Sequence, residues 1–248
     1  MKVAEVYFSA TDNTKVSVHE MAAAIAGGTT EVIDVTSGSS ALVTRAFGEE
    51  DVVVVGMPVY GGRCPKLAME RLAGITGKGT TCIVVVTYGN RDYDDALLEL
   101  CDVMKERGFI VKGAAALIGK HTFGEIQVTR PDADDLEACR SFALQAMEND
   151  NKNVSVKGNR PYKDGGNGGS FRPSTTDACV KCGLCVKKCS AHAIDTDCKS
   201  ISDACISCFR CIKVCPMHAK QMMSEAYDEF AAGFTARLSK RLENEFFL

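Results

Sequence analysis

Short apolar runs alternate with amphipathic stretches over the first 147 residues of the chain. Apolar, β-branched runs typical of strands occupy residues 3–8, 31–35, 51–56, 81–87 and 109–118. Stretches with helical spacing occupy residues 16–26, 65–73, 94–107 and 132–147. Strands that alternate with helices predict a parallel sheet that is covered by helices on both faces.

Two of the strand runs are apolar at every position, at residues 52–55 and 83–86. Such runs are typical of central strands that are buried on both faces. Five strands of this kind predict a doubly wound, flavodoxin-like α/β sheet in the order 2-1-3-4-5. The ligand crevice of that topology lies at the carboxyl ends of strands 1 and 3.

The pattern divides the chain into four parts, the first of which is the α/β domain at residues 1–148. Residues 149–175 are polar and glycine-rich, so we expect a flexible linker. Residues 176–220 form a small cysteine-rich domain, and residues 221–248 are predicted to form one amphipathic helix of about six turns. Its apolar stripe consists of Tyr227, Phe230, Phe234, Leu238, Leu242 and Phe246. We expect the stripe to pack on the α/β domain, with a homodimer contact through this helix as the alternative.

Eight of the 13 cysteines repeat one spacing, C-x2-C-x2-C-x3-C. The first copy contains Cys179, Cys182, Cys185 and Cys189, and the second contains Cys205, Cys208, Cys211 and Cys215. Each cysteine of the second copy follows its counterpart by 26 residues, as Cys205 follows Cys179. In this pattern three cysteines bind one [4Fe–4S] cluster and the fourth binds the other. We therefore expect Cys215 to complete the first cluster and Cys189 to complete the second.

Other uses of these cysteines fit the sequence less well. A disulfide framework is disfavoured by the odd count of 13, and structural zinc usually uses C-x-x-C pairs that are well separated. The stretch resembles bacterial two-cluster ferredoxins, with Ser190 where that family has the proline that Pro216 supplies in the second copy. Of the remaining cysteines, Cys82 and Cys101 are expected in the core, Cys64 lies beside a predicted ring loop, and Cys198 is interpreted as spare.

A hydroxyl-rich loop follows the first strand and contains Ser9, Thr11, Asn13 and Thr14. Hydroxyl groups together with the N–H groups of a helix N-terminus form an anion site. The loop resembles the phosphate loop of flavodoxins, which binds the terminal phosphate of FMN without a salt bridge. Asp12 stands where that family usually has glycine. Aspartate tolerates a left-handed backbone, but its charge must point away from the phosphate.

Two further loops follow the third and fourth strands and reach the same end of the sheet. They contribute the candidate residues Pro58, Val59, Tyr60 and Gly61, and Thr87, Tyr88, Gly89, Asn90 and Tyr93. The resemblance to flavodoxins implies that these loops flank the isoalloxazine ring, with glycines for close approach and tyrosines for stacking. His121, after the fifth strand, either borders the ring or lies on the surface.

The whole chain resembles fusions of a flavodoxin-like domain with a two-cluster ferredoxin, sometimes called ferrodoxins. The resemblance implies FMN and two [4Fe–4S] clusters as cofactors, and redox partner proteins as electron donor and acceptor. We expect an electron-transfer protein. One alternative is a flavin-dependent reductase of a small substrate such as a quinone, fed through the clusters; the other is a redox-sensing or partner-binding protein with structural clusters. No catalytic triad or carboxylate pair is evident, so the chemistry belongs to the cofactors.

Charge and hydropathy exclude other classes of protein. The formal net charge is −3 and no long basic run is present, which argues against nucleic-acid binding. No stretch approaches the ~20 apolar residues of a membrane span. The first eight residues have a strand pattern rather than that of a targeting peptide. Because cluster ligands are reduced thiolates, we expect a cytoplasmic, low-oxygen setting.

Overall fold

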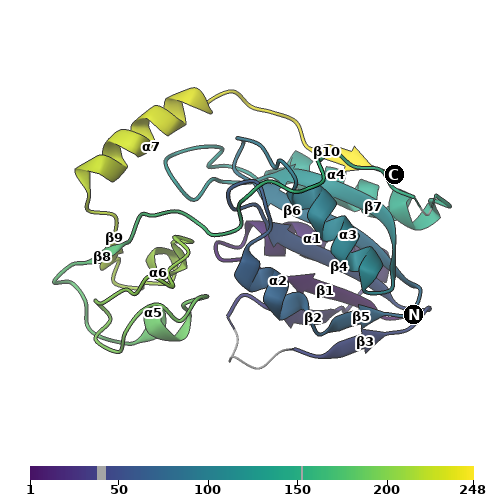
Figure 1. Ribbon diagram of the computed structural model, residues 1–248, viewed down its shortest axis with the longest axis horizontal. Helices are drawn as coiled ribbons and strands as arrows, with labels where there is room; N and C mark the ends of the chain where they lie inside the picture. The colour runs from purple at the N-terminus through teal and green to yellow at the C-terminus, as the bar shows by residue number, and fades with distance from the viewer. Residues whose placement is uncertain (38–42, 152) are drawn as a thin grey trace.

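The computed structural model describes residues 1–37, 43–151 and 153–248. Residues 38–42, within the predicted first domain, and residue 152, within the predicted linker, lie outside the described residues. Figure 1 shows a large α/β domain beside a smaller cysteine-rich domain, which contains α5 and α6. Helix α7 runs along the outside of the molecule between these two domains.

Five parallel strands form most of the main sheet. They are β1 (Val3–Tyr7), β2 (Glu31–Asp34), β4 (Val52–Pro58), β6 (Thr80–Tyr88) and β7 (Phe109–Ile118). Their order is β2-β1-β4-β6-β7, and each pairs in parallel with its neighbours. The apolar run at residues 52–55 is buried, as expected for a central strand. The chain thus has a flavodoxin-like α/β fold with a mixed, mostly parallel sheet.

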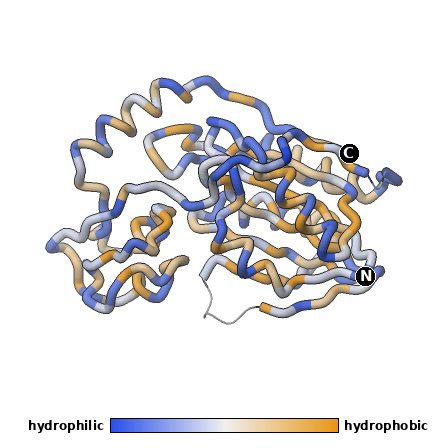
Figure 2. Tube along the Cα trace, viewed as in Figure 1, coloured by the Kyte–Doolittle hydropathy of each residue, from blue (hydrophilic) through white to orange (hydrophobic). Residues whose placement is uncertain are grey.

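Two helices cover each face of the sheet. Helices α1 (Asn13–Ala26) and α4 (Ala133–Glu148) pack on one face, where Met21 and Phe142 join a common apolar core with strand residues. Helices α2 (Lys66–Leu72) and α3 (Ala96–Glu106) pack on the other. In Figure 2 the strands at the centre are mostly hydrophobic and the outer loops mostly hydrophilic. The sheet is therefore buried on both faces, and its carboxyl-end loops remain accessible for a site.

The main sheet has six strands rather than the predicted five, because the C-terminus adds one. Strand β10 (Glu245–Phe247) pairs antiparallel with β7 and opposes residues 114–116. The predicted helix over residues 221–248 is therefore too long: the structure has a helix, α7 (Glu225–Arg237), over part of this range only, and residues 238–244 have no regular structure. The physical reason is that an edge strand presents unpaired backbone groups, and a C-terminal strand satisfies them.

Short elements complete the fold. Strands β3 (Arg45–Phe47) and β5 (Ile75–Gly77) pair in parallel beside the main sheet. In the cysteine-rich domain, β8 (Ser174–Thr175) pairs antiparallel with β9 (Lys220–Gln221), so that the beginning and the end of this domain lie side by side. Between them lie the single-turn helices α5 (Leu184–Lys187) and α6 (Arg210–Lys213), one in each cysteine copy. Among the described helices, none is long and apolar enough to cross a membrane.

The segment predicted as a linker lies against the α/β domain. The Arg160 guanidinium pairs with Asp102 at 2.7 Å, and Lys163 N donates to Asp95 Oδ2 at 2.8 Å. Farther along, Gly166 N donates to Tyr60 O at 2.8 Å. These contacts bring the glycine-rich stretch to the carboxyl ends of the strands, so this segment reaches the region of the predicted site.

Candidate functional site

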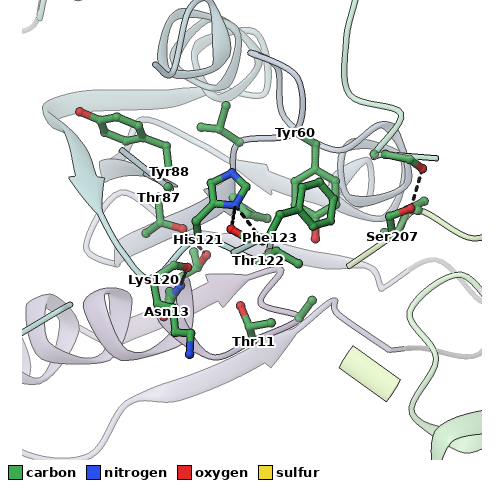
Figure 3. Close-up of a pocket in the computed structure, with 18 of the residues that line it drawn as sticks. Thr11, Asn13, Tyr60, Thr87, Tyr88, Lys120, His121, Thr122, Phe123 and Ser207 are labelled. Carbon is green, nitrogen blue, oxygen red and sulfur yellow. Dashed lines mark hydrogen bonds between the residues drawn. The ribbon is translucent and has the colours of Figure 1, made fainter. Parts of the chain in front are cut away.

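A pocket lies at the carboxyl ends of β1, β4, β6 and β7 (Figure 3). It encloses about 920 Å³ of atom-free space, part of it open to solvent. Eleven of the thirteen predicted flavin-binding residues line it. They are Ser9, Thr11, Asn13, Thr14, Pro58, Val59, Tyr60, Gly61, Thr87, Tyr88 and Gly89.

The loop between β1 and α1 forms one side of this pocket. Asp12 has φ 72°, the left-handed conformation expected where the flavodoxin pattern has glycine. Ser9 Oγ accepts a hydrogen bond from Lys15 N at 3.0 Å, and Thr14 Oγ1 lies 2.6 Å from Thr87 Oγ1. The first turn of α1 contains no acidic residue. The hydroxyl groups and the positive end of the α1 dipole therefore provide a favourable environment for an anion.

Tyrosines stand on the opposite side. Burial raises the pKa of the Tyr88 phenol to about 12, and Tyr88 packs edge-on against Tyr93 at 5.4 Å between ring centroids. Burial also raises the pKa of Tyr60 well above its ordinary value, with a further contribution from the nearby Cys208 and Cys205 side chains. These tyrosines are therefore neutral at physiological pH, and Tyr60 and Tyr88 are both among the residues that line the pocket.

Two predicted residues do not line the pocket. Asn90 is buried, and its Nδ2 donates to Leu238 O at 2.9 Å and to Lys240 O at 2.6 Å. The Tyr93 hydroxyl donates to Glu245 Oε2 at 3.0 Å. Both side chains hold the C-terminal segment on the loop after β6. In this structure they support the pocket from outside it.

His121 lies in the pocket wall, as one of its two interpretations suggested. Its Nδ1 accepts a hydrogen bond from Phe123 N at 2.8 Å, and its ring packs edge-on against Phe234 at 4.9 Å. Burial lowers the pKa of His121 to about 4, so the ring is neutral at physiological pH. Lys120, Thr122 and Phe123 share this wall and were missed, although their place after the fifth strand is a signal that could have indicated them.

Four further lining residues come from outside the α/β domain: Gly168, Gly169, Ile206 and Ser207. The last two stand between Cys205 and Cys208. The Ser207 hydroxyl lies 2.5 Å from Gly169 O and accepts a hydrogen bond from Arg172 Nη1 at 2.8 Å. No local sequence pattern marks these residues as part of a pocket, because only domain docking brings them there.

The eight repeat cysteines line two cavities with about 330 and 340 Å³ of atom-free space, part of it open to solvent. The first is lined by Cys179, Cys182, Cys185 and Cys215, and the second by Cys189, Cys205, Cys208 and Cys211. Each set is the one that the spacing predicts for a single cluster. Cys189 Sγ accepts from Ala193 N at 3.3 Å, and Cys215 Sγ accepts from Ala219 N at 3.2 Å. The fourth cysteines of the two copies thus accept the same backbone hydrogen bond, from the residue four positions farther along.

The side chains that line the two cavities are compatible with thiolate ligation of a cluster. Among the residues described, no group of three or more His, Cys, Asp or Glu side chains converges on one metal position. In a [4Fe–4S] site four cysteines bind one cluster, so convergence on one ion is not required. Lys220 lines the first cavity, is 2% exposed, and its Nζ has no hydrogen-bond partner in the described structure. A buried ammonium needs a negative partner, which thiolate ligands would supply.

Cys198 is a fifth cysteine in the first cavity, although the sequence suggested a spare residue. It is 1% exposed and adopts φ 62° between the two copies. Its side chain belongs to the apolar core that surrounds both cysteine sets. The turn that brings it there could not be recognised from spacing, since Cys198 has no counterpart in the repeat.

An aromatic cluster joins four segments of the chain beside the pocket. Phe123 of the α/β domain packs against Phe171 at 5.8 Å and against Phe209 of the cysteine-rich domain at 5.1 Å. Tyr227 and Phe230 of α7 lie 6.3 and 6.1 Å from Phe123. The N-terminal part of the predicted C-terminal stripe therefore packs on its own chain, at the junction of both domains.

Comparisons with known proteins are distant. No protein-family model matches the chain, and no curated protein sequence does. Among solved structures it is similar to a flavodoxin from the domain Archaea, with 19% identity, a TM-score of 0.42, and coverage of 60% of this chain and 97% of that chain. It is also similar to Flavodoxin 1 from Bacillus cereus, with 19% identity, a TM-score of 0.44, and coverage of 60% of this chain and 98% of that chain. A third similar structure is the rubredoxin oxygen:oxidoreductase from the anaerobe Desulfovibrio gigas, with 15% identity, a TM-score of 0.43, and coverage of 59% of this chain and 35% of that chain.

Proposed function

We propose that this chain is an electron-transfer protein in which FMN binds in the pocket of the α/β domain and two [4Fe–4S] clusters bind in the cysteine cavities. FMN takes up two electrons and releases them singly, whereas each cluster transfers one. The protein binds the flavin phosphate with the hydroxyl-rich loop and the α1 N-terminus, and the ring between Tyr60 and Tyr88. Thiolates of the eight repeat cysteines bind the clusters.

One observation supports transfer between these cofactors most directly. Ile206 and Ser207 line the flavin pocket, and the residues on either side of them, Cys205 and Cys208, line the second cysteine cavity. The wall between the pocket and that cavity is therefore a single short loop. We assign the cluster of this cavity as the direct partner of the flavin.

The first cavity is suited to exchange with another protein. In the first cavity only Cys185 is buried, with Cys182 exposed and Cys179 and Cys215 partly exposed, whereas in the second only Cys205 is partly exposed and the other three cysteines are buried. Val180, the counterpart of Ile206, is 62% exposed. The first cluster would therefore face a redox partner protein, and the second would face the flavin.

The reductase alternative has less support. Among the described residues that line the pocket there is no aspartate or glutamate, and His121, whose pKa burial lowers to about 4, is not an imidazolium acid at neutral pH. Segments of the cysteine-rich domain and of residues 168–169 already form part of the wall. A small substrate would need additional space beside the ring.

Anaerobic stopped-flow mixing of the loaded protein with dithionite tests the proposal. Flavin reduction through the clusters should follow cluster reduction at a rate that changes neither when the protein is diluted nor when the dithionite concentration is raised. A rate that falls in proportion to dilution would mean exchange between molecules and would contradict intramolecular transfer.

A pair of glycine variants tests the role of docking. A Cβ at Gly168 (φ 58°) would lie 2.0 Å from Ile206 O, whereas one at Gly27 (φ 59°) would meet nothing within 4 Å. Both substitutions to alanine carry the same backbone strain, but only Gly168→Ala displaces the wall loop. We expect slower flavin reduction in Gly168→Ala and an unchanged rate in Gly27→Ala.

A further inference from the structure

The second cysteine copy differs from the first where it meets the α/β domain. Arg210 stands at the repeat position of Leu184, and Phe209 at that of Gly183. Phe209 keeps a left-handed backbone at φ 54°, a conformation that disfavours a bulky side chain. Lys213 matches Lys187, which is exposed in α5. Helix α6 therefore carries features that the symmetry of the repeat does not require.

The two cations of α6 contact the loop between β1 and α1. Arg210 Nη1 donates to Ser9 O at 2.9 Å and to Ala10 O at 3.3 Å. Lys213 Nζ donates to Thr11 O at 2.6 Å and pairs with Asp12 Oδ2 at 2.6 Å. Three successive carbonyl groups and one carboxylate of the loop are thus bound by the cysteine-rich domain.

These contacts orient the donors of the loop. In a planar trans peptide unit the C=O and N–H groups point in opposite directions. Carbonyl groups of Ser9, Ala10 and Thr11 directed at α6 therefore direct the following N–H groups away from it. Successive N–H groups on one side of a loop bind anions. Lys213 also offsets the charge of Asp12, which would otherwise repel a phosphate.

We propose that Arg210 and Lys213 complete the phosphate site of FMN from the second domain, so that FMN affinity depends on the docking of α6. This inference rests on the proposed function. Arg210 also lines the second cysteine cavity, and its Nε is buried without a hydrogen-bond partner in the described part of the chain. One side chain therefore belongs to both sites and couples the flavin loop to the cluster segment.

Titration of the full-length protein with FMN, followed by flavin fluorescence, tests this coupling. Arg210→Leu installs the residue of the first copy and should weaken FMN binding by about tenfold or more, because hydrogen bonds from a charged group are lost. Lys213→Ala should weaken it by about threefold, since the pair is partly exposed. The matched control Lys187→Ala should bind FMN as the wild type does.

Riboflavin, which lacks the phosphate, distinguishes an effect on the phosphate loop from a general loss of flavin binding. Its affinity should stay within about twofold of the wild type in both α6 variants, because the lost contacts act on the phosphate loop. Equal losses for FMN and riboflavin would overturn the assignment, as would FMN affinities that remain unchanged. If Arg210→Leu fails to fold by circular dichroism, Lys213→Ala decides. A wild-type protein that binds neither flavin would instead contradict the proposed function, and this proposal with it.

Discussion

Lys220 and Ile194 occupy equivalent positions in the two copies of the repeat, and each lines a different cysteine cavity. Lys220 places a buried ammonium group beside the first set of cysteines, whereas Ile194 places an aliphatic side chain beside the second. This repeat position is therefore charged in the first cavity and apolar in the second, where Arg210 lines the wall from another position. A positive charge favours the reduced, more negative state of a cluster, and net charge is one determinant of cluster potential.

Replacing Lys220 with the residue of the other copy should lower one cluster potential. In Lys220→Ile the first cluster loses its buried positive neighbour, so its midpoint potential should become more negative while the second changes little. An anaerobic redox titration followed by EPR measures both. Lys187→Ala, which removes an exposed charge on the same domain, is the control. An unchanged first potential would mean that Lys220 does not act on that cluster.

The exchange of the fourth cysteine between copies gives a second prediction. Cys189→Ala should damage the cluster that Cys205, Cys208 and Cys211 hold, since Cys189 lines their cavity. Cys215→Ala should damage the other one. Iron analysis and EPR of the reduced variants distinguish the two. Loss confined to the Cys179 cluster in Cys189→Ala would show that the pairing is wrong.

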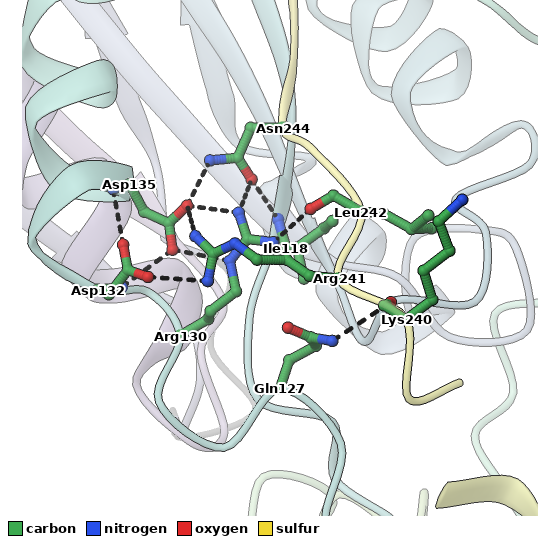
Figure 4. A network of polar contacts seen from close by, with 9 residues as sticks. All are labelled: Ile118, Gln127, Arg130, Asp132, Asp135, Lys240, Arg241, Leu242 and Asn244. Atoms are coloured by element: carbon green, nitrogen blue, oxygen red, sulfur yellow. Dashed lines mark hydrogen bonds and ion pairs between the residues drawn. The ribbon is translucent and has the colours of Figure 1, made fainter. Parts of the chain in front are cut away.

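A polar network fixes the C-terminal segment to the sheet (Figure 4). Asn244 Oδ1 accepts from Ile118 N at 2.9 Å and from Arg130 Nη2 at 3.0 Å, and its Nδ2 donates to Asp135 Oδ1 at 2.9 Å. Arg130 and Asp135 form a buried ion pair. Asn244 thus connects β7 and the ion pair to strand β10, which begins at the next residue.

Asn244→Ala should lower the free energy of unfolding by about 2–3 kcal/mol, because hydrogen bonds to the buried ion pair are lost. Urea denaturation under anaerobic conditions measures the change. Lys240→Ala, in the same segment, should change stability by less than about 0.5 kcal/mol, since that residue contacts Asn90 through its carbonyl group. Equal stability of both variants would contradict an anchoring role for Asn244.

His121 predicts a pH dependence of stability. Burial lowers its folded-state pKa from 6.5 to about 4, so below the unfolded value of 6.5 the unfolded chain binds the extra proton. This contribution to stability is fully present above that value and is lost as the pH falls toward 4. Between about pH 7.5 and about pH 5.5 the loss amounts to about 1.4 kcal/mol.

The variant His121→Phe keeps an aromatic ring without a titrating group. Its unfolding free energy should therefore decline less than that of the wild type over the same pH interval, by about 1.4 kcal/mol. Urea denaturation at both pH values provides the comparison. Identical pH dependences in the two proteins would mean that His121 is not buried as a neutral ring.

The sequence alone determined the main elements of the α/β domain and the loops around its pocket. Strands that are apolar at every position bury their side chains only in a sheet that is covered on both faces. In a parallel sheet the loops after successive strands lie at the same edge of the sheet. Thus the strand pattern alone predicts that Thr14 and Thr87, far apart in the chain, both lie at the pocket, where their hydroxyl groups are in contact. The cysteine spacing likewise grouped the residues that line each cavity.

Only the tertiary structure decided how the C-terminal half completes the site. The apolar spacing through Leu242 and Phe246 predicted a continuing helix, but the free edge of β7 offered backbone partners that turned residues 245–247 into a strand. Ile206 and Ser207 reach the pocket because Arg210, Lys213 and the Phe123 cluster dock the second domain on the first. Such contacts join residues up to about 200 positions apart. Their energies depend on surfaces that exist only after each part has folded, and local periodicity carries no information about them.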